Sequence, residues 1–138
     1  MKTIAVDIGT TTIKCALFND GKVEKFFAKE YSLIYEGKRI MQNPEDWKNI
    51  IKEGFSSFGD ISDVKGLGIS SQGITIIPVD EKGTPITLAD SWLDYTAETE
   101  LEKIKKNFGK EKIFSLTGKN LIPCYSIFKI MRFVESGI

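Results

Sequence analysis

The chain has 138 residues and 41% hydrophobic content, which is enough to bury a core, so one domain is the default expectation. Its 19 basic and 19 acidic residues balance, and this charge gives no reason to expect binding to nucleic acid or to an anionic membrane surface. No run approaches the roughly 18 apolar residues of a membrane span and no signal peptide is recognisable, so we expect a cytoplasmic protein.

The first half of the chain predicts a β-β-β-α order. The strands cover residues 3–8, 13–19 and 22–31. Asn19-Asp20-Gly21 joins the second strand to the third and is a strong hairpin signal. A polar stretch around Glu36 to Arg39 follows, to which we assign no element. Asn43 and Pro44 then provide an N-cap and a first helical residue, so a helix is expected to begin there.

The second half predicts more strands and then helices. Residues 64–70 read as a short buried strand. Residues 75–79 and 84–88 are expected to pair as a hairpin through Glu81-Lys82-Gly83. The spacing of apolar residues predicts helices over residues 96–108, 110–116 and 125–135.

The turn after the first strand has the composition of a phosphate-binding hairpin. An apolar strand ends at Asp7, and the turn that follows contains Gly9, Thr10, Thr11 and Thr12, with Lys14 just beyond it. Gly9 allows a backbone path that is closed to residues with a Cβ atom. Inward-facing amides and Thr hydroxyls suit phosphate oxygens. A carboxylate such as Asp7 needs a divalent cation beside phosphate, and Mg²⁺ is the expected ion. A plain hairpin turn is the alternative interpretation.

These residues resemble those of a known family. Asp7-Ile-Gly-Thr-Thr-Thr-Ile-Lys14 is similar to the first phosphate motif of the sugar kinase, Hsp70 and actin superfamily, and most similar to that of the FGGY carbohydrate kinases, which include xylulose, gluconate and glycerol kinases. Further segments resemble the family in the same order: Val64 to Gly73, Thr75 to Ile86, Ser91 to Asp94, Thr117-Gly118 and Tyr125 to Lys129.

The resemblance implies an α/β fold of the ribonuclease-H-like type. It implies that residues 1–138 are the N-terminal part of the first domain of an FGGY kinase, incomplete at the C-terminal end, without the rest of that domain or the second domain. The implied activity is ATP-dependent phosphorylation of a hydroxyl on a sugar, ketose, polyol or sugar acid. Asp7 would act in catalysis beside Mg²⁺ and the γ-phosphate, and Gly9 to Thr12 would face the phosphates of ATP. Lys14 would either hold phosphate or simply project from the second strand into solvent.

Three further residues are implied to bind the substrate. Gln72 follows a strand at the carboxyl end of the sheet, where its amide can donate to and accept from a hydroxyl. Glycerol kinases follow this Gln with Arg and Glu, whereas Gly73 and Ile74 stand here, so glycerol is a poor candidate. Xylulose kinases usually have Gln-Met-His-Gly at this loop, and the absence of Met and His also counts against xylulose.

Trp92 and Asp94 match the family's Trp-x-Asp signature. The indole would pack on an apolar sugar face and the carboxylate would accept hydroxyl hydrogen bonds. Core packing beneath the following helix is the alternative role for Trp92. Many relatives place Arg within the next two residues, but Tyr95 and Thr96 stand here. The rigid, planar set of hydrogen-bond donors of a guanidinium is therefore missing at this place in the sequence.

The remaining expectations concern activity and assembly. The family's general base lies downstream of the residues present, so we expect the 138-residue chain to be inactive alone. An exposed third strand or an uncovered sheet face would favour a homodimer or other self-association. Two alternatives remain: an ATPase like the activators of 2-hydroxyacyl-CoA dehydratases, for which Cys15 and Cys124 lack a cluster-like spacing, and a nonenzymatic kinase-like binding module.

Overall fold

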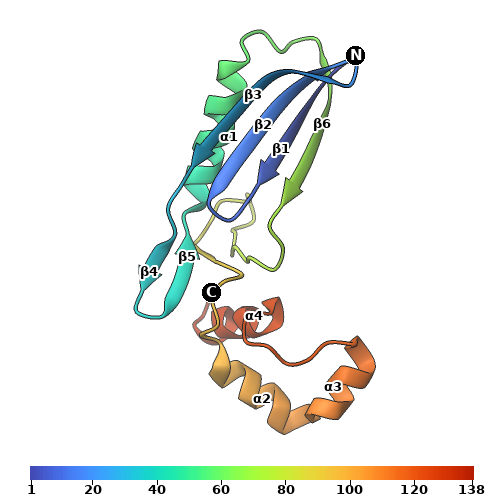
Figure 1. Ribbon diagram of the computed structural model, residues 1–138. Helices are drawn as coiled ribbons and strands as arrows, with labels where there is room; N and C mark the ends of the chain where they lie inside the picture. Colours follow the sequence, from blue (N-terminus) through green and yellow to red (C-terminus); the bar gives the residue numbers. More distant parts are fainter. The chain divides into compact units, whose positions relative to one another are not determined.

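The computed structural model describes residues 1–138 and divides into two compact units (Figure 1). Unit 1 contains residues 1–33 and 43–72, and unit 2 contains residues 34–42 and 73–138. Each unit is therefore built from two separate stretches of the chain.

Unit 1 is a four-stranded sheet with the order β3-β2-β1-β6. The strands are β1 (Lys2–Ile8), β2 (Thr12–Asn19), β3 (Lys22–Glu30) and β6 (Val64–Ser71). The first three form an antiparallel meander, and β6 returns parallel to β1. The three predicted N-terminal strands and the predicted strand after the helix are confirmed to within two residues at each end.

Helix α1 (Pro44–Ser57) connects the meander to β6 and starts where the sequence predicts. The Asn43 side chain accepts a hydrogen bond from the Glu45 amide at 3.1 Å, and Pro44 occupies the first turn. The helix packs against β2 and β3. The core beneath it consists of Ile4, Val6, Ile13, Cys15, Leu17, Ile50 and Phe58.

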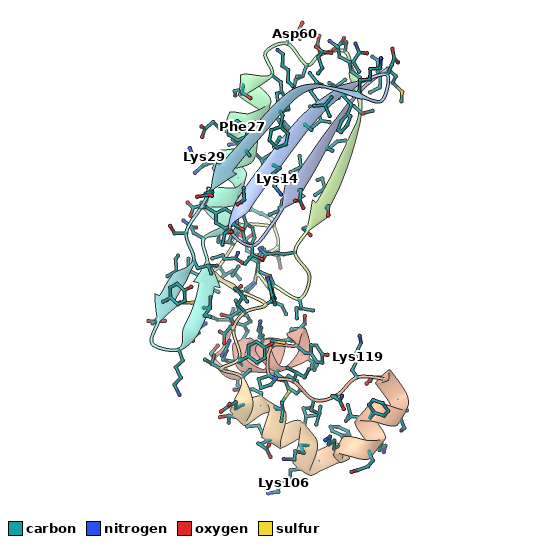
Figure 2. The ribbon with its side chains drawn as sticks, viewed as in Figure 1. Lys14, Phe27, Lys29, Asp60, Lys106 and Lys119 are labelled. Carbon is teal, nitrogen blue, oxygen red and sulfur yellow. The ribbon has the colours of Figure 1, made fainter.

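Gly54 lets α1 approach the sheet closely. A Cβ atom at this position would lie 2.9 Å from Cys15 Sγ and 2.9 Å from Phe27 Cδ1 (Phe27 is labelled in Figure 2). Cys15 is fully buried, so the helix would have to move away from the sheet.

We therefore expect Gly54→Ala to lower the free energy of unfolding by about 1–3 kcal/mol, although Ala is the better helix former. Urea unfolding of the two proteins measures this difference. Ser56→Ala, on the exposed side of the same helix, is the control and should stay within about 0.5 kcal/mol of wild type. A gain in stability for Gly54→Ala would contradict the close packing.

The prediction that residues 64–70 form a buried strand is right about the strand and wrong about the burial. Leu67 and Ile69 of β6 are 55% and 65% exposed. They pair with the buried residues Ile4 and Val6 of β1, but α1 covers β2 and β3 instead of β6. An apolar strip of the sheet is consequently uncovered beside the helix.

Unit 2 contains a small sheet and three helices. The sheet has the order β4-β5-β7, formed by β4 (Ile34–Glu36), β5 (Arg39–Gln42) and β7 (Ala89–Asp90). The helices are α2 (Glu98–Phe108), α3 (Lys110–Thr117) and α4 (Ser126–Glu135), which confirms all three predicted helices. No helix in the structure combines the length and the apolar character needed to cross a membrane.

Unit 2 differs from the expectations in two places. The β4–β5 hairpin occupies the polar stretch to which no element was assigned, with Gly37 in the left-handed conformation (φ +60°) at its turn. The predicted hairpin of residues 75–79 and 84–88 forms only at its tip, where one antiparallel bridge joins Val79 to Pro85 and the Asp80 amide donates to the Thr84 carbonyl at 2.9 Å. Pro85 has no amide to donate to a ladder, and Ile76 instead pairs with Asp90.

Candidate functional site

Asp7 and Lys14 lie opposite each other on β1 and β2 of unit 1. Asp7 Oδ2 and Lys14 Nζ are 3.9 Å apart, and the two side chains are 49% and 54% exposed (Lys14 is labelled in Figure 2). An exposed ion pair at this separation is weak, so the carboxylate keeps its capacity for another partner. Both side chains line a cavity of about 370 Å³ together with Ser70 at the end of β6.

The turn between these strands is tightly closed at Gly9. The Gly9 amide donates to the Thr12 carbonyl at 3.0 Å, and a Cβ atom at Gly9 would lie 2.9 Å from that same oxygen. Close backbone approach is thus the reason why glycine is required, as the sequence predicts. Thr10 and Thr12 are half-buried in this turn and Thr11 is exposed.

Tyr31 anchors the turn, although sequence reasoning gave it no role in the site. Its hydroxyl donates to the Gly9 carbonyl, and its amide donates to the Thr11 carbonyl at 2.9 Å. Its ring packs edge-on against Trp47, with centroids 6.4 Å apart. The available signal was an aromatic residue with a hydroxyl group just after the third strand. That strand runs antiparallel to the second and therefore ends beside the Gly9 turn.

Tyr31 also gives the stability of unit 1 an expected dependence on pH. Burial raises the pKa of the Tyr31 phenol above its ordinary value of 10.0, and the Asp46 carboxylate acts in the same direction. The folded state therefore keeps the proton when the unfolded chain has released it, so this contribution to stability is complete below pH 10 and is lost as the pH rises further.

We expect Tyr31→Phe to lower the free energy of unfolding by about 1 kcal/mol at pH 7, because the hydrogen bond to Gly9 is lost. Above pH 10 the difference from wild type should shrink, because only the wild-type protein loses stability through this phenol. Urea unfolding of both proteins between pH 7 and about pH 11 measures the two curves. Parallel curves over this range would contradict the proposed burial of the phenol.

Gln72 lies at the same edge of the unit 1 sheet as Asp7 and the Gly9 turn. Its backbone amide donates to the Ile8 carbonyl at 2.9 Å and so continues the pairing of β6 with β1. Its side chain is hydrogen-bonded to that of Tyr31. The parallel strands β1 and β6 both end here, and the carboxyl ends of parallel strands are the usual place for ligands in α/β sheets.

Trp92 and Asp94 lie in unit 2, in the loop that follows β7. The Trp92 amide donates to Thr75 Oγ1 at 3.1 Å. The Asp94 carboxylate is completely buried, and its Oδ1 accepts hydrogen bonds from the Thr96 amide and the Thr96 hydroxyl, both at 2.6 Å. Asp94 Oδ2 lies 3.4 Å from Arg132 Nη2 of α4.

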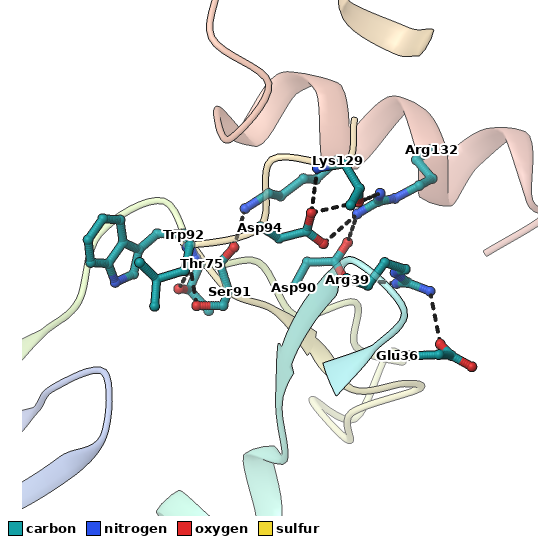
Figure 3. A network of polar contacts seen from close by, with 11 residues as sticks. Glu36, Arg39, Thr75, Asp90, Ser91, Trp92, Asp94, Lys129 and Arg132 are labelled. Atoms are coloured by element: carbon teal, nitrogen blue, oxygen red, sulfur yellow. Dashed lines mark hydrogen bonds and ion pairs between the residues drawn. The ribbon is translucent and has the colours of Figure 1, made fainter. Parts of the chain in front are cut away.

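A network of buried charges surrounds this loop (Figure 3). Asp90 is fully buried and pairs with Arg39 of β5 at 2.9 Å and with Arg132. Lys129 is fully buried and its ammonium donates to the Ser91 carbonyl. Burial lowers the pKa of Lys129, while the nearby Asp94 and Asp90 carboxylates oppose this shift.

Sequence reasoning missed Asp90, Lys129 and Arg132 as members of this network. The signal was present in α4, where Lys129 and Arg132 share a helical stripe with Phe128 and Phe133, both of which are buried. Two basic residues on an apolar stripe need buried partners. Arg132 thus supplies Asp94 with a guanidinium from α4, although no arginine follows the Trp-x-Asp signature directly.

Comparisons with known proteins agree with this fold. The model for the N-terminal domain of the FGGY family of carbohydrate kinases matches residues 2–136. Xylulose kinase from Staphylococcus xylosus is 27% identical over 133 residues, which cover 93% of this chain and 28% of that protein. The chain therefore spans little more than a quarter of this curated relative.

Two crystal structures show the same fold. Ligand-bound xylulose kinase from Lactobacillus acidophilus gives a TM-score of 0.81 at 23% identity, covering 96% of this chain and 28% of that chain. Glycerol kinase from Plasmodium falciparum with ADP gives a TM-score of 0.81 at 20% identity, covering 97% of this chain and 28% of that chain. The fold is thus the α/β, ribonuclease-H-like fold expected from the sequence, and the chain belongs to the FGGY family of carbohydrate kinases.

Proposed function

We propose that this chain is the N-terminal part of the first domain of an ATP-dependent carbohydrate kinase that phosphorylates a hydroxyl of a ketose, polyol or sugar acid. The observation that carries the proposal is the edge of the unit 1 sheet where Asp7, the Gly9 turn and Gln72 lie together. Membership of the FGGY family gives the reaction class.

Asp7 and the turn are proposed to handle the phosphates of ATP. Phosphoryl transfer depends mainly on positioning and on neutralising phosphate charge. The half-exposed Asp7 carboxylate fits Mg²⁺, which prefers carboxylate, water and phosphate oxygens as ligands. When bound, the ion would neutralise phosphate charge. The groups of Gly9 to Thr12 would face the phosphates, and Lys14 would add a positive charge beside them.

Gln72 and Trp92 are proposed to contact the sugar. The Gln72 side-chain amide offers both a donor and an acceptor to a hydroxyl. The hydrogen bond with Tyr31 would orient this side chain. The Trp92 indole would pack on an apolar sugar face. Gly73 and Ile74 follow Gln72. The preferred candidate substrates are therefore sugar acids, and ketoses other than xylulose, ahead of glycerol.

The general base is expected downstream of Ile138. We therefore expect kinase activity only from a native polypeptide that contains residues 1–138 together with that base. An antibody raised against this chain would give the size of that polypeptide in an extract of the source cell. ADP release by the purified native polypeptide, with ATP, Mg²⁺ and a panel of ketoses, polyols and sugar acids, then tests the activity. We expect ADP release that depends on one sugar class, and none from the 138-residue chain alone.

Two outcomes would overturn parts of this proposal. Sugar-dependent ADP release by the isolated chain would show that the base lies within residues 1–138. A native polypeptide of 15.5 kDa without kinase activity would instead favour a nonenzymatic binding module. The family match is to carbohydrate kinases, so the dehydratase-activator alternative has no support of its own.

A further inference from the structure

The carboxylate of Asp94 is buried, and both of its oxygens have partners within unit 2. Its side chain is 0% exposed, Oδ1 accepts two hydrogen bonds from Thr96 at 2.6 Å, and Oδ2 faces Arg132 at 3.4 Å. Because the side chain has no exposed surface, a sugar hydroxyl could reach this carboxylate only by displacing the groups packed around it. Such a displacement would leave a buried donor or a buried charge without its partner, which is costly.

Arg132 ties together the two carboxylates that flank Trp92 in the sequence. Its Nη2 atom contacts Asp90 Oδ2 and Asp94 Oδ2 (Figure 3). Its Nη1 atom donates to the Thr96 hydroxyl at 2.8 Å. The planar guanidinium offers donors in a fixed fork, so one side chain can hold three partners in a defined geometry. We call these four residues, Asp90, Asp94, Thr96 and Arg132, the Arg132 clamp.

The backbone between the two carboxylates is also fixed. The Ser91 amide donates to the Ile40 carbonyl at 3.0 Å, and the Ser91 carbonyl accepts from the buried Lys129 ammonium and from the Asp94 amide. The Trp92 amide donates to Thr75 Oγ1 at 3.1 Å. With the backbone held on both sides, the direction of the Trp92 Cα–Cβ bond, from which the indole projects, is fixed.

We infer that Asp94 is a positioning residue of the Arg132 clamp, which holds Trp92 in the orientation needed for sugar binding, and that Asp94 does not itself contact the sugar. The inference rests on the proposed function for the role of Trp92. In this chain the guanidinium of the clamp is that of Arg132 in α4, and the residues directly after Asp94 contain no arginine.

Three variants test the clamp, each in a Trp47→Phe background, so that Trp92 is the only tryptophan among residues 1–138. Thr96→Val removes the bridging hydroxyl with little change of shape, Arg132→Lys keeps the charge without the fork, and Asp94→Asn keeps an acceptor for Thr96. Lys103→Gln is the control, because it removes an exposed ion pair with Glu135 between α2 and α4 outside the clamp.

Two measurements are made on the native polypeptide that contains these residues. We expect all three clamp variants to raise the KM for the sugar about tenfold, equivalent to about 1.4 kcal/mol, while kcat and the KM for ATP stay within about twofold. Acrylamide quenching of Trp92 fluorescence, taken as the difference between each protein and the same protein with Trp92→Phe, should increase in the same three variants. Lys103→Gln should change neither quantity. A loss of overall stability alone would not produce this pattern well below the melting temperature.

The outcomes separate the clamp from a direct contact. If Asp94→Asn alone raises the sugar KM, while Thr96→Val and Arg132→Lys leave the KM and the quenching unchanged, Asp94 is a sugar ligand and the inference is wrong. If the native polypeptide phosphorylates no sugar, the proposed function fails, but the quenching still decides on the clamp. Unchanged quenching in Thr96→Val, the variant least disturbing to the fold, would then overturn it.

Discussion

Replacement of Asp7 by Asn in the native polypeptide is expected to lower kcat by about 10²–10³-fold, because a charge that would stabilise the transition state through the metal is removed. The fold should survive, since the Asp7 side chain is half-exposed and its ion pair with Lys14 spans 3.9 Å. Steady-state ADP release at saturating sugar and ATP measures kcat, and circular dichroism checks the fold.

A matched control for Asp7 is available in the same unit. Asp63 is 58% exposed and pairs with Lys2 at 3.0 Å, so Asp63→Asn removes a comparable surface carboxylate away from the turn. Asp63→Asn should leave kcat unchanged. If Asp7→Asn also retains wild-type turnover, Asp7 has no place in the catalytic site. A rise in the Mg²⁺ concentration needed for half-maximal rate would link Asp7 to the ion specifically.

Replacement of Gly9 by Ala is expected to lower kcat/KM for ATP by about 10²-fold, because displacement of a phosphate-holding turn by as little as 1 Å can have an effect of this size. The new methyl carbon would lie 2.9 Å from the Thr12 carbonyl, so the turn must open. The hydrogen bond from the Gly9 amide to Thr12 closes the turn and would be strained first. Initial rates at varied ATP and fixed sugar measure the effect.

Gly66 of β6 provides the comparison for Gly9. A Cβ atom there would meet only Thr3 Cγ2, at 3.5 Å, which is ordinary contact. Gly66→Ala should therefore retain its kcat/KM for ATP. Equal behaviour of the two alanine variants would mean that the turn tolerates a side chain, and the phosphate role of Gly9 to Thr12 would lose its structural basis.

The elements that sequence reasoning predicts well are those with local determinants. Asn19-Asp20-Gly21 and the Asn43 cap are short-range signals, and the structure places a hairpin and a helix start there. The β4–β5 hairpin was missed because its strands are only three and four residues long, too short to show an alternating pattern around the polar turn. The hairpin expected after residue 75 is limited to its tip, because Ile76 pairs with Asp90, fourteen residues further along the chain, and no local pattern reveals that partner.

The candidate site divides in the same way. Asp7 and Gly9 lie in one contiguous motif, and the need for glycine could be argued from the turn alone. Tyr31 reaches Gly9 across 22 residues, and Arg132 reaches Asp90 across 42 residues. Such contacts depend on how strands and helices are brought together, so the sequence could mark these residues as unusual but could not name their partners.

The division of each unit into two stretches of chain has a consequence for the order of events during synthesis. Unit 1 can complete its sheet once β6, which ends at Ser71, has left the ribosome, because all its strands and α1 precede that point. The β4–β5 hairpin belongs to unit 2, and β5 receives its pairing partner only with Ala89–Asp90. Residues 34–42 must therefore wait, incompletely paired, while the sheet on either side of them in the sequence is already formed. Such a segment is where nascent chains are most exposed to premature association.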